Sequence, residues 1–328
     1  MEGNHGNKVR IDPKLLAGEL ERIYSAEEAE LAKVAKGRGA IHGSVMPRTY
    51  VGPAYGRAEL AGRAVPRVLV MSINQSRQGQ EGLTKEQVRQ SMREIRRDGD
   101  RFLPDGFGPR GLAANLCRWI FMQCGVDGND IRPQDIHDSI AYDNFVKWPF
   151  NVGSSRPDKD VWPVFYPINK AILEALQPEI ILCLGRPMYD HIWRAVEKDR
   201  RYRWEKNVSG WCFSLFGPWG RCELGWCYHY SNPIWPKRIW RELCEQGTPP
   251  GKAMPLLRAH SSRIASPVDL MRTIDKDKQN YPWWDDETYA GKAYTEYNPY
   301  QKAVAWNLCK SMTARWSGRS GPASVASC

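Results

Sequence analysis

Long apolar runs are missing from this 328-residue sequence. None approaches the ~18 consecutive apolar residues that a membrane-spanning helix needs. The amino-terminal stretch MEGNHGNKVR also lacks the apolar core of a secretory signal peptide. We therefore expect a cytoplasmic protein that makes no membrane contact.

Paired cysteines are missing as well. The nine cysteines include no C-x-x-C pair, and the closest two, Cys222 and Cys227, have no second pair or histidine at the spacing of a metal site. This pattern disfavours a zinc module and a disulfide-stapled scaffold. We expect reduced thiols, most of them buried, and no bound metal.

Positive charge, in contrast, is in excess. Lys and Arg number 47 against 37 Asp and Glu, which gives a net charge of +10. Cationic side chains release counterions when they meet phosphates, so this balance favours a polyanionic partner such as nucleic acid. The 14 Trp and 14 Tyr provide surfaces on which unpaired bases can stack, although packing in the core is the other role open to them.

Short apolar runs alternate with segments of helical periodicity. Strands are expected at residues 67–74, 139–148, 179–185 and 223–231, and helices at 12–36, 84–97, 112–126, 165–177, 187–201 and 236–246. Strands that alternate with helices of this length indicate βαβ crossovers and a mostly parallel sheet. We therefore predict an α/β fold of three layers, α/β/α, around a central four-stranded sheet.

Composition divides the chain into four parts. Residues 1–64 supply an N-terminal helix and a loop rich in Gly, Pro and Arg, and residues 65–246 carry the alternating pattern of the predicted catalytic domain. Residues 247–316 form an aromatic-rich extension that we expect to pack on this domain, with one helix at 301–316. The Ser/Gly tail at 317–328 is expected to be disordered.

Polar residues stand at the carboxyl ends of the expected strands. Asn74 ends the first strand, Asn144 lies in the second and His229 in the last. Ligands of parallel α/β sheets bind beyond these ends, so we expect a site on this rim. Asn144, in the stretch YDNFVKWPF, is unusual because Asn side chains compete for backbone hydrogen bonds and are depleted from strands.

Four stretches, taken in order, resemble the motifs of the uracil-DNA glycosylase superfamily. They are SINQS at 72–76, GFGPRG at 106–111, NFVKWP at 144–149 with the later run PEIILCLG, and HYSNP at 229–233. The resemblance covers about residues 65–245. It implies a monofunctional DNA glycosylase of this fold, which flips a nucleotide out of the stack and hydrolyses its N-glycosidic bond without a cofactor, leaving an abasic site.

The resemblance also assigns roles to individual residues. Asn74 would position the water that attacks C1′ of the sugar, and His229 would stabilise the charge that leaves on the base. Asn144 would read the base edge, since a carboxamide offers one acceptor and two donors, and Phe107 would stack on the flipped base. The alternatives are a strand-end cap for Asn144, a core position for Phe107 and a purely structural histidine for His229. Lys147 is expected to pair with the backbone or lie in solvent, not to contact substrate.

The expected base pocket departs from the superfamily pattern. Gln75 replaces the usual Pro and Ser72 the usual Gly, which leaves the loop conformation open. Gln75 and Ser76 belong to the base-binding set, and Ser76 stands where strict uracil enzymes carry a Tyr that blocks groups on pyrimidine C5. A small residue there favours a bulky 5-substituted cytosine, such as the glucosylated hydroxymethylcytosine that some phage-defence members remove. Antiviral defence is then the implied setting, and uracil removal in base excision repair is the alternative.

The expected DNA-facing loop departs from the pattern too. HYSN replaces the HPSP of the superfamily, so Ile234 or Trp235 becomes the candidate wedge between bases. Lys237 and Arg238 stand where a helix N-terminus meets phosphate. We expect a monomer that binds duplex or locally unpaired DNA. The first cysteine is Cys117, so the early cysteine pair of iron–sulfur members is missing and no cluster is expected.

Two other classes of function stay open at this point. A non-catalytic nucleic-acid-binding protein would keep the same fold and would have lost activity through the changes in SINQS. A nucleotide hydrolase is disfavoured because the sequence contains no Walker phosphate-binding loop.

Overall fold

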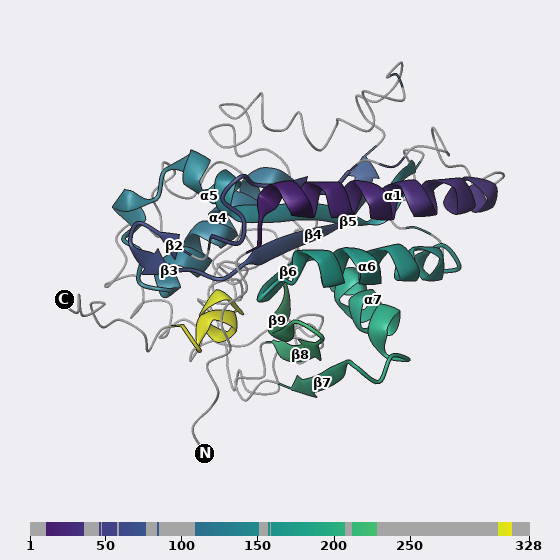
Figure 1. Ribbon diagram of the computed structural model, residues 1–328. Coiled ribbons are helices and arrows are strands. Elements are labelled where there is room, and N and C mark those ends of the chain that lie inside the picture. The colour runs from purple at the N-terminus through teal and green to yellow at the C-terminus, as the bar shows by residue number, and fades with distance from the viewer. Residues whose placement is uncertain are drawn as a thin grey trace, which may run out of the picture.

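The computed structural model describes residues 11–35, 46, 48–57, 59–76, 84, 109–150, 157, 159–206, 212–227 and 308–316. These segments form a mixed α/β structure around a central sheet (Figure 1). The helix predicted at 236–246 and the tail at 317–328 lie outside the described residues. So does the helix predicted at 84–97, apart from Thr84.

The sheet has seven strands in the order β1-β5-β4-β6-β9-β8-β7. Its four central strands run parallel, and they are β5 (Ile140–Phe150), β4 (Val68–Ser76), β6 (Ile180–Leu184) and β9 (Gly220–Cys227). Three more strands join the two edges by antiparallel pairing, namely β1 (Tyr50–Val51), β8 (Phe213–Gly217) and β7 (Arg203–Lys206). The prediction of an α/β fold with a mostly parallel sheet is confirmed, whereas the sheet is wider than the four strands predicted.

The central strands are apolar because the sheet is covered on both faces. All five residues of β6, with the sequence IILCL, are fully buried, and so is the run Val68–Met71 of β4. Strands buried on both faces read as continuous hydrophobic runs instead of alternating ones. This is why the sequence pattern located these strands correctly.

Three helices lie side by side on one face of the sheet (Figure 1), and they are α1 (Pro13–Ala35), α6 (Tyr166–Leu176) and α7 (Arg186–Val196). The ring of Phe145 in β5 contacts Tyr166 of α6 and His191 of α7. Tyr24 of α1 donates a hydrogen bond to Asp143 of the same strand. Side chains two residues apart on a strand share a face, so all three helices cover the face of Asp143 and Phe145.

The opposite face carries α4 (Pro109–Gln123) and the helical residues 308–313. Gly225 of β9 lies in register with Tyr142 across β6 and β4, and Tyr142 alternates with Asp143, so Gly225 belongs to this second face. A Cβ placed on Gly225 would lie 2.4 Å from Cδ1 of Leu308. The absence of a side chain at this position therefore lets the C-terminal helical turn pack directly on the strand.

The remaining elements are short: β2 (Glu59–Leu60), β3 (Arg63–Ala64), the 3-10 helices η2 (Gly128–Asp130) and η3 (Trp162–Phe165), and the helix α5 (Pro133–Ser139). The helices predicted at 12–36, 112–126, 165–177 and 187–201 are confirmed as α1, α4, α6 and α7. Of the helix predicted at 301–316, residues 308–313 are helical. The loop expected before residue 65 contains β1 and the β2–β3 hairpin, and α5, β7 and β8 were not predicted.

His191 is part of an aromatic cluster that joins η3, α6 and α7. Its ring stacks on Trp162 with centroids 4.1 Å apart and planes 5° apart, and its Nδ1 shares a hydrogen bond with the Tyr166 hydroxyl at 2.7 Å. Burial, assisted by the positive charge of Arg194, lowers the pKa of His191 from 6.5 to about 4. The folded protein therefore keeps this imidazole neutral at neutral pH.

Gly52 follows β1 and lies against the last turn of α5. A Cβ on this residue would lie 2.3 Å from the backbone oxygens of both His137 and Asp138. The Gly52 N–H donates to the carbonyl of Ile140 at 2.9 Å, which fixes the strand this close to the helix. Only glycine fits here without movement of the backbone.

We expect Gly52→Ala to lower the free energy of unfolding by about 1–3 kcal/mol, because the added methyl group must displace main-chain atoms. Gly18→Ala is the matched control, since a Cβ there meets nothing within 4 Å and alanine favours the helix by about 1 kcal/mol. Urea unfolding of both variants measures the difference. A Gly52→Ala protein as stable as wild type would contradict the close approach.

Stability should fall as the pH drops from about 6.5 to about 4. In that window His191 becomes protonated in the unfolded chain but stays neutral in the folded protein, so a falling pH favours the unfolded state. His191→Phe keeps a ring on Trp162 and cannot titrate, so its free energy of unfolding should decline less over the same window. Urea titrations between pH 7 and pH 4.5 provide the test, and parallel curves for the two proteins would refute it.

Candidate functional site

The carboxyl ends of β4 and β5 meet at one edge of the sheet, where the sequence places two of its polar residues. Ser72 is the register partner of Asn144, and Asn74 is the partner of Val146. Asn74 therefore stands on the strand next to Asn144, two positions further toward the rim. The structure brings the backbones of these two predicted site residues together.

Ser72, one of the departures from the superfamily pattern, continues the regular pairing of β4. It is buried, and its Oγ shares a hydrogen bond of 2.5 Å with the hydroxyl of Tyr142. This serine is thus accommodated inside the strand without loss of register.

The β5 strand bulges after Val146, two residues beyond Asn144. Two steps along β4, from Asn74 to Ser76, correspond to four steps along β5, from Val146 to Phe150. The extra residues belong to the KWP sequence, and proline is tolerated in a sheet chiefly at edges and bulges because it has no N–H to donate. Bulges re-aim the chain at the ends of strands and are common next to functional sites.

Asn144 itself is buried, with 6% of its surface exposed. It alternates with Asp143, whose side chain faces α1, so the Asn144 side chain lies on the opposite face, together with Tyr142 and Ser72. A carboxamide in such a position is shielded from water, and hydrogen bonds formed by it are stronger in the low local dielectric.

A buried ion pair lies directly behind Asn144. The Lys147 ammonium contacts Oδ2 of Asp143 at 2.5 Å, and the two side chains are 1% and 2% exposed. The same ammonium donates to the carbonyl of Asn144 at 2.6 Å, and the Asn144 N–H donates to Oδ1 of Asp143 at 2.8 Å. The expectation that Lys147 pairs with the backbone is confirmed, and sequence reasoning missed Asp143.

Helix α1 contributes a hydroxyl to this ion pair. Tyr24 donates to Oδ1 of Asp143 at 3.4 Å and shares a 2.8 Å hydrogen bond with Oγ1 of Thr49, whose own N–H donates to the Tyr24 oxygen at 3.1 Å. Burial and the Asp143 charge raise the pKa of Tyr24 well above 10, so it remains a neutral donor. Burial lowers the pKa of Lys147, and the neighbouring carboxylate opposes that shift.

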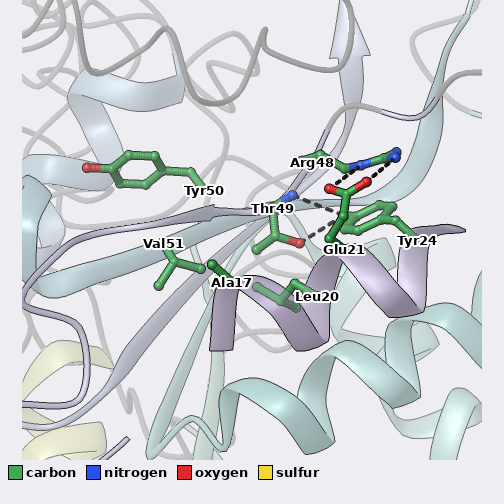
Figure 2. Close-up of a pocket in the computed structure, with 8 residues that line it drawn as sticks. All are labelled: Ala17, Leu20, Glu21, Tyr24, Arg48, Thr49, Tyr50 and Val51. Carbon is green, nitrogen blue, oxygen red and sulfur yellow. Dashed lines mark hydrogen bonds and ion pairs between the residues drawn. The ribbon is translucent and has the colours of Figure 1, made fainter. Parts of the chain in front are cut away.

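A pocket of about 220 Å³ lies between α1 and β1, lined by Ala17, Leu20, Glu21, Tyr24, Arg48, Thr49, Tyr50 and Val51 (Figure 2). Arg48 is its buried cation, and the guanidinium packs over the ring of Tyr24 at 4.8 Å. Every guanidinium nitrogen of Arg48 already bonds to Glu21 or Glu28. Among the described residues that line it, the pocket therefore offers no unneutralised cation for a phosphate or a carboxylate, and we do not assign the predicted site to it.

The other predicted site residues differ in how far the structure describes them. Gln75 and Ser76, like Asn74, are described by their backbone at the end of β4. Six more lie outside the described residues, namely Phe107, His229, Ile234, Trp235, Lys237 and Arg238. Their predicted roles stay predictions.

The described residues also bear on metals, thiols and membranes. Within the described segments, no group of three or more His, Cys, Asp or Glu side chains is placed to hold a metal ion. The six cysteines that can be assessed are buried thiols, as expected, and they are Cys117, Cys124, Cys183, Cys212, Cys222 and Cys309. No helix within the same segments is both long enough and apolar enough to cross a membrane.

Compared with known proteins, the sequence matches no family model, and no curated protein matches it significantly.

Proposed function

We propose that this protein is a monofunctional DNA glycosylase that hydrolyses the N-glycosidic bond of a modified pyrimidine and leaves an abasic site. The observation that carries the proposal is the register of β4 on β5, which sets Asn74 on the strand next to Asn144, two positions nearer the carboxyl edge. These residues belong to two of the four stretches that resemble uracil-DNA glycosylase motifs. Ligands of parallel sheets bind at this edge.

The arrangement of Asn144 supports base recognition. Its side chain lies on the face away from α1 and is almost fully shielded from water. An enzyme that acts on a flipped base must hold it by hydrogen bonds to its edge, and a carboxamide offers both an acceptor and donors.

The state of Lys147 argues against this lysine as the amine of a strand-cleaving mechanism. Cleavage of the strand by an enzyme amine would need a lysine that forms a Schiff base with the opened sugar. The ammonium of Lys147 is buried, paired with Asp143 and located on the face opposite the Asn144 side chain. Water, positioned by Asn74, is then the nucleophile in this proposal, and His229 stabilises the departing base.

The favoured substrate is a cytosine with a bulky group on C5, such as glucosylated hydroxymethylcytosine in phage DNA. Ser76 ends β4 in register with Phe150, at the rim where the pyrimidine would enter. A serine is small enough to leave the C5 side of the base uncovered. The corresponding biological role is defence against phage, with uracil removal in repair as the second substrate.

Excision assays test the proposal directly. DNAs that carry uracil, hydroxymethylcytosine or glucosylated hydroxymethylcytosine are incubated with the protein and then cleaved with alkali at abasic sites. We expect Asn144→Ala, Asn74→Ala and His229→Ala each to lower the single-turnover rate by about 10²–10³-fold, as does loss of one group that stabilises a transition state. Gln134→Ala, which removes an exposed carboxamide of α5 before the start of β5, is the control and should keep the wild-type rate.

If the wild-type protein binds all three DNAs without producing abasic sites, the proposed glycosylase activity is rejected. That result would favour the non-catalytic nucleic-acid-binding protein instead.

The substrate preference is tested by Ser76→Tyr. The added ring should cover the C5 side of the pocket, so excision of a bulky 5-substituted cytosine should be lost while activity on uracil is kept. A close-packed site cannot absorb a ring, so the effect on kcat/KM for the bulky base should be large. Equal losses on both bases would mean that the end of β4 had been disrupted. Full activity on the bulky base would place Ser76 away from C5.

A further inference from the structure

A gain in folding stability does not by itself explain the ion pair between Asp143 and Lys147. Both charges are almost completely removed from water, and the cost of desolvation commonly cancels the attraction between the partners. Apolar residues of similar volume would fill the same space and often give an equally stable protein. The role of this pair is therefore sought in the groups that it contacts.

Its hydrogen bonds converge on the main chain of one residue. Asp143 accepts the N–H of Asn144, and Lys147 donates to the carbonyl of Asn144, so the two members of the pair hold both backbone polar groups of this residue. In a regular strand, Cα atoms four residues apart are separated by about 13 Å. The bulge that begins after Val146 and the long lysine side chain bring the ammonium back to Asp143.

The pair is braced from outside the strand. Tyr24 of α1 donates to the carboxylate oxygen that also accepts the Asn144 N–H, and Thr49 holds the Tyr24 hydroxyl on its other side. The ring of Tyr24 lies 5.9 Å from the Lys147 nitrogen. The position of Asp143 is thus set by α1 and by the segment that leads into β1, not by β5 alone.

We propose that Asp143 and Lys147 are positioning residues for Asn144. They clamp its backbone from the α1 face of the sheet, and so fix the direction in which its carboxamide projects from the other face. A group that reads a base edge must be held within about 0.5 Å of its working geometry, which a strand bordered by a bulge does not guarantee by itself. This inference rests on the proposed function, in which Asn144 holds the base.

The test compares two double variants in the full-length protein. Asp143→Leu/Lys147→Met removes both charges together, which avoids a single unpaired charge in the interior. Arg221→Met/Glu223→Leu is the control, because it removes an ion pair with a buried carboxylate on β9, which is separated from β5 by β4 and β6. We expect the first to lower the single-turnover excision rate by about 10–100-fold, as small misplacements of a catalytic group do, with DNA affinity unchanged. The second should stay within about threefold of wild type, since it leaves the geometry of Asn144 intact.

A mutant cycle separates positioning from general damage. If the pair acts through Asn144, then Asp143→Leu/Lys147→Met should lower the rate in the wild-type background and have almost no further effect in the Asn144→Ala background. Equal losses in both backgrounds would overturn the inference and leave the glycosylase proposal standing. An unchanged rate in the wild-type background would also overturn it.

A second measurement does not depend on activity. The side-chain amide resonances of Asn144, identified by their loss in Asn144→Ala, should be sharp in wild type and broadened by exchange in Asp143→Leu/Lys147→Met. The broadening should be absent in Arg221→Met/Glu223→Leu. Sharp resonances in both double variants would overturn the positioning role even if the wild type excised none of the bases. If the wild type excises none of the bases and the broadening is still observed, the glycosylase proposal is rejected and the positioning role stands.

Discussion

Beyond Tyr142 the outer edge of β5 has no strand beside it in the described part of the chain, because β1 pairs only with Ala141 and Tyr142. Buried backbone N–H and C=O groups must still find partners, and each one left without a partner would cost about as much as a lost hydrogen bond. Side chains meet this requirement here. Asp143 and Lys147 bond to the main-chain N–H and carbonyl of Asn144.

This solution makes α1 part of the sheet structure. Pairing of β1 with β5 begins at Tyr50. The N–H of the preceding residue, Thr49, donates to the hydroxyl of Tyr24 instead of to a strand. The same hydroxyl reaches Asp143, while Arg48 ties this segment to two carboxylates of α1. Helix, edge strand and central strand are thereby connected through one buried polar network, in which the loss of a single partner would leave a desolvated group unpaired.

The sequence predicted the parts of the fold that depend on burial alone. The apolar runs of β4 and β6 are recognisable because both of their faces are covered, and α6 is recognisable from its periodic apolar stripe. The hairpin of β7 and β8 escaped prediction because RWEK and FSLFG mix charged, small and aromatic residues on a sheet edge that is partly open. Local sequence patterns predict buried central strands well and predict strands at the edge of a sheet poorly.

Prediction of the site met a different limit. Asn74 and Asn144 were proposed from strand-end position and motif resemblance, and the parallel register does place their backbones on adjacent strands. The network behind Asn144 had no comparable signal, since Tyr24 and Asp143 are 119 residues apart and belong to no common motif. A lysine four residues after an aspartate signals an ion pair on a helix, where such residues are neighbours, but not on a strand. Only the bulge makes that contact in β5.

The sheet itself separates the charges of the network from the face on which Asn144 projects. Asp143 and Lys147 lie on the α1 side, so their influence reaches the carboxamide through the backbone that they hold, with the strand between them and any ligand. A nearly neutral pair of opposite charges also adds little net field on the far side. The Asn144 face can then remain uncharged, which suits recognition of a neutral base by hydrogen bonds in a low dielectric. Under the proposed function, attraction of DNA must accordingly come from other cationic residues of this basic chain, because Lys147 and Arg48 are already paired with carboxylates inside the protein.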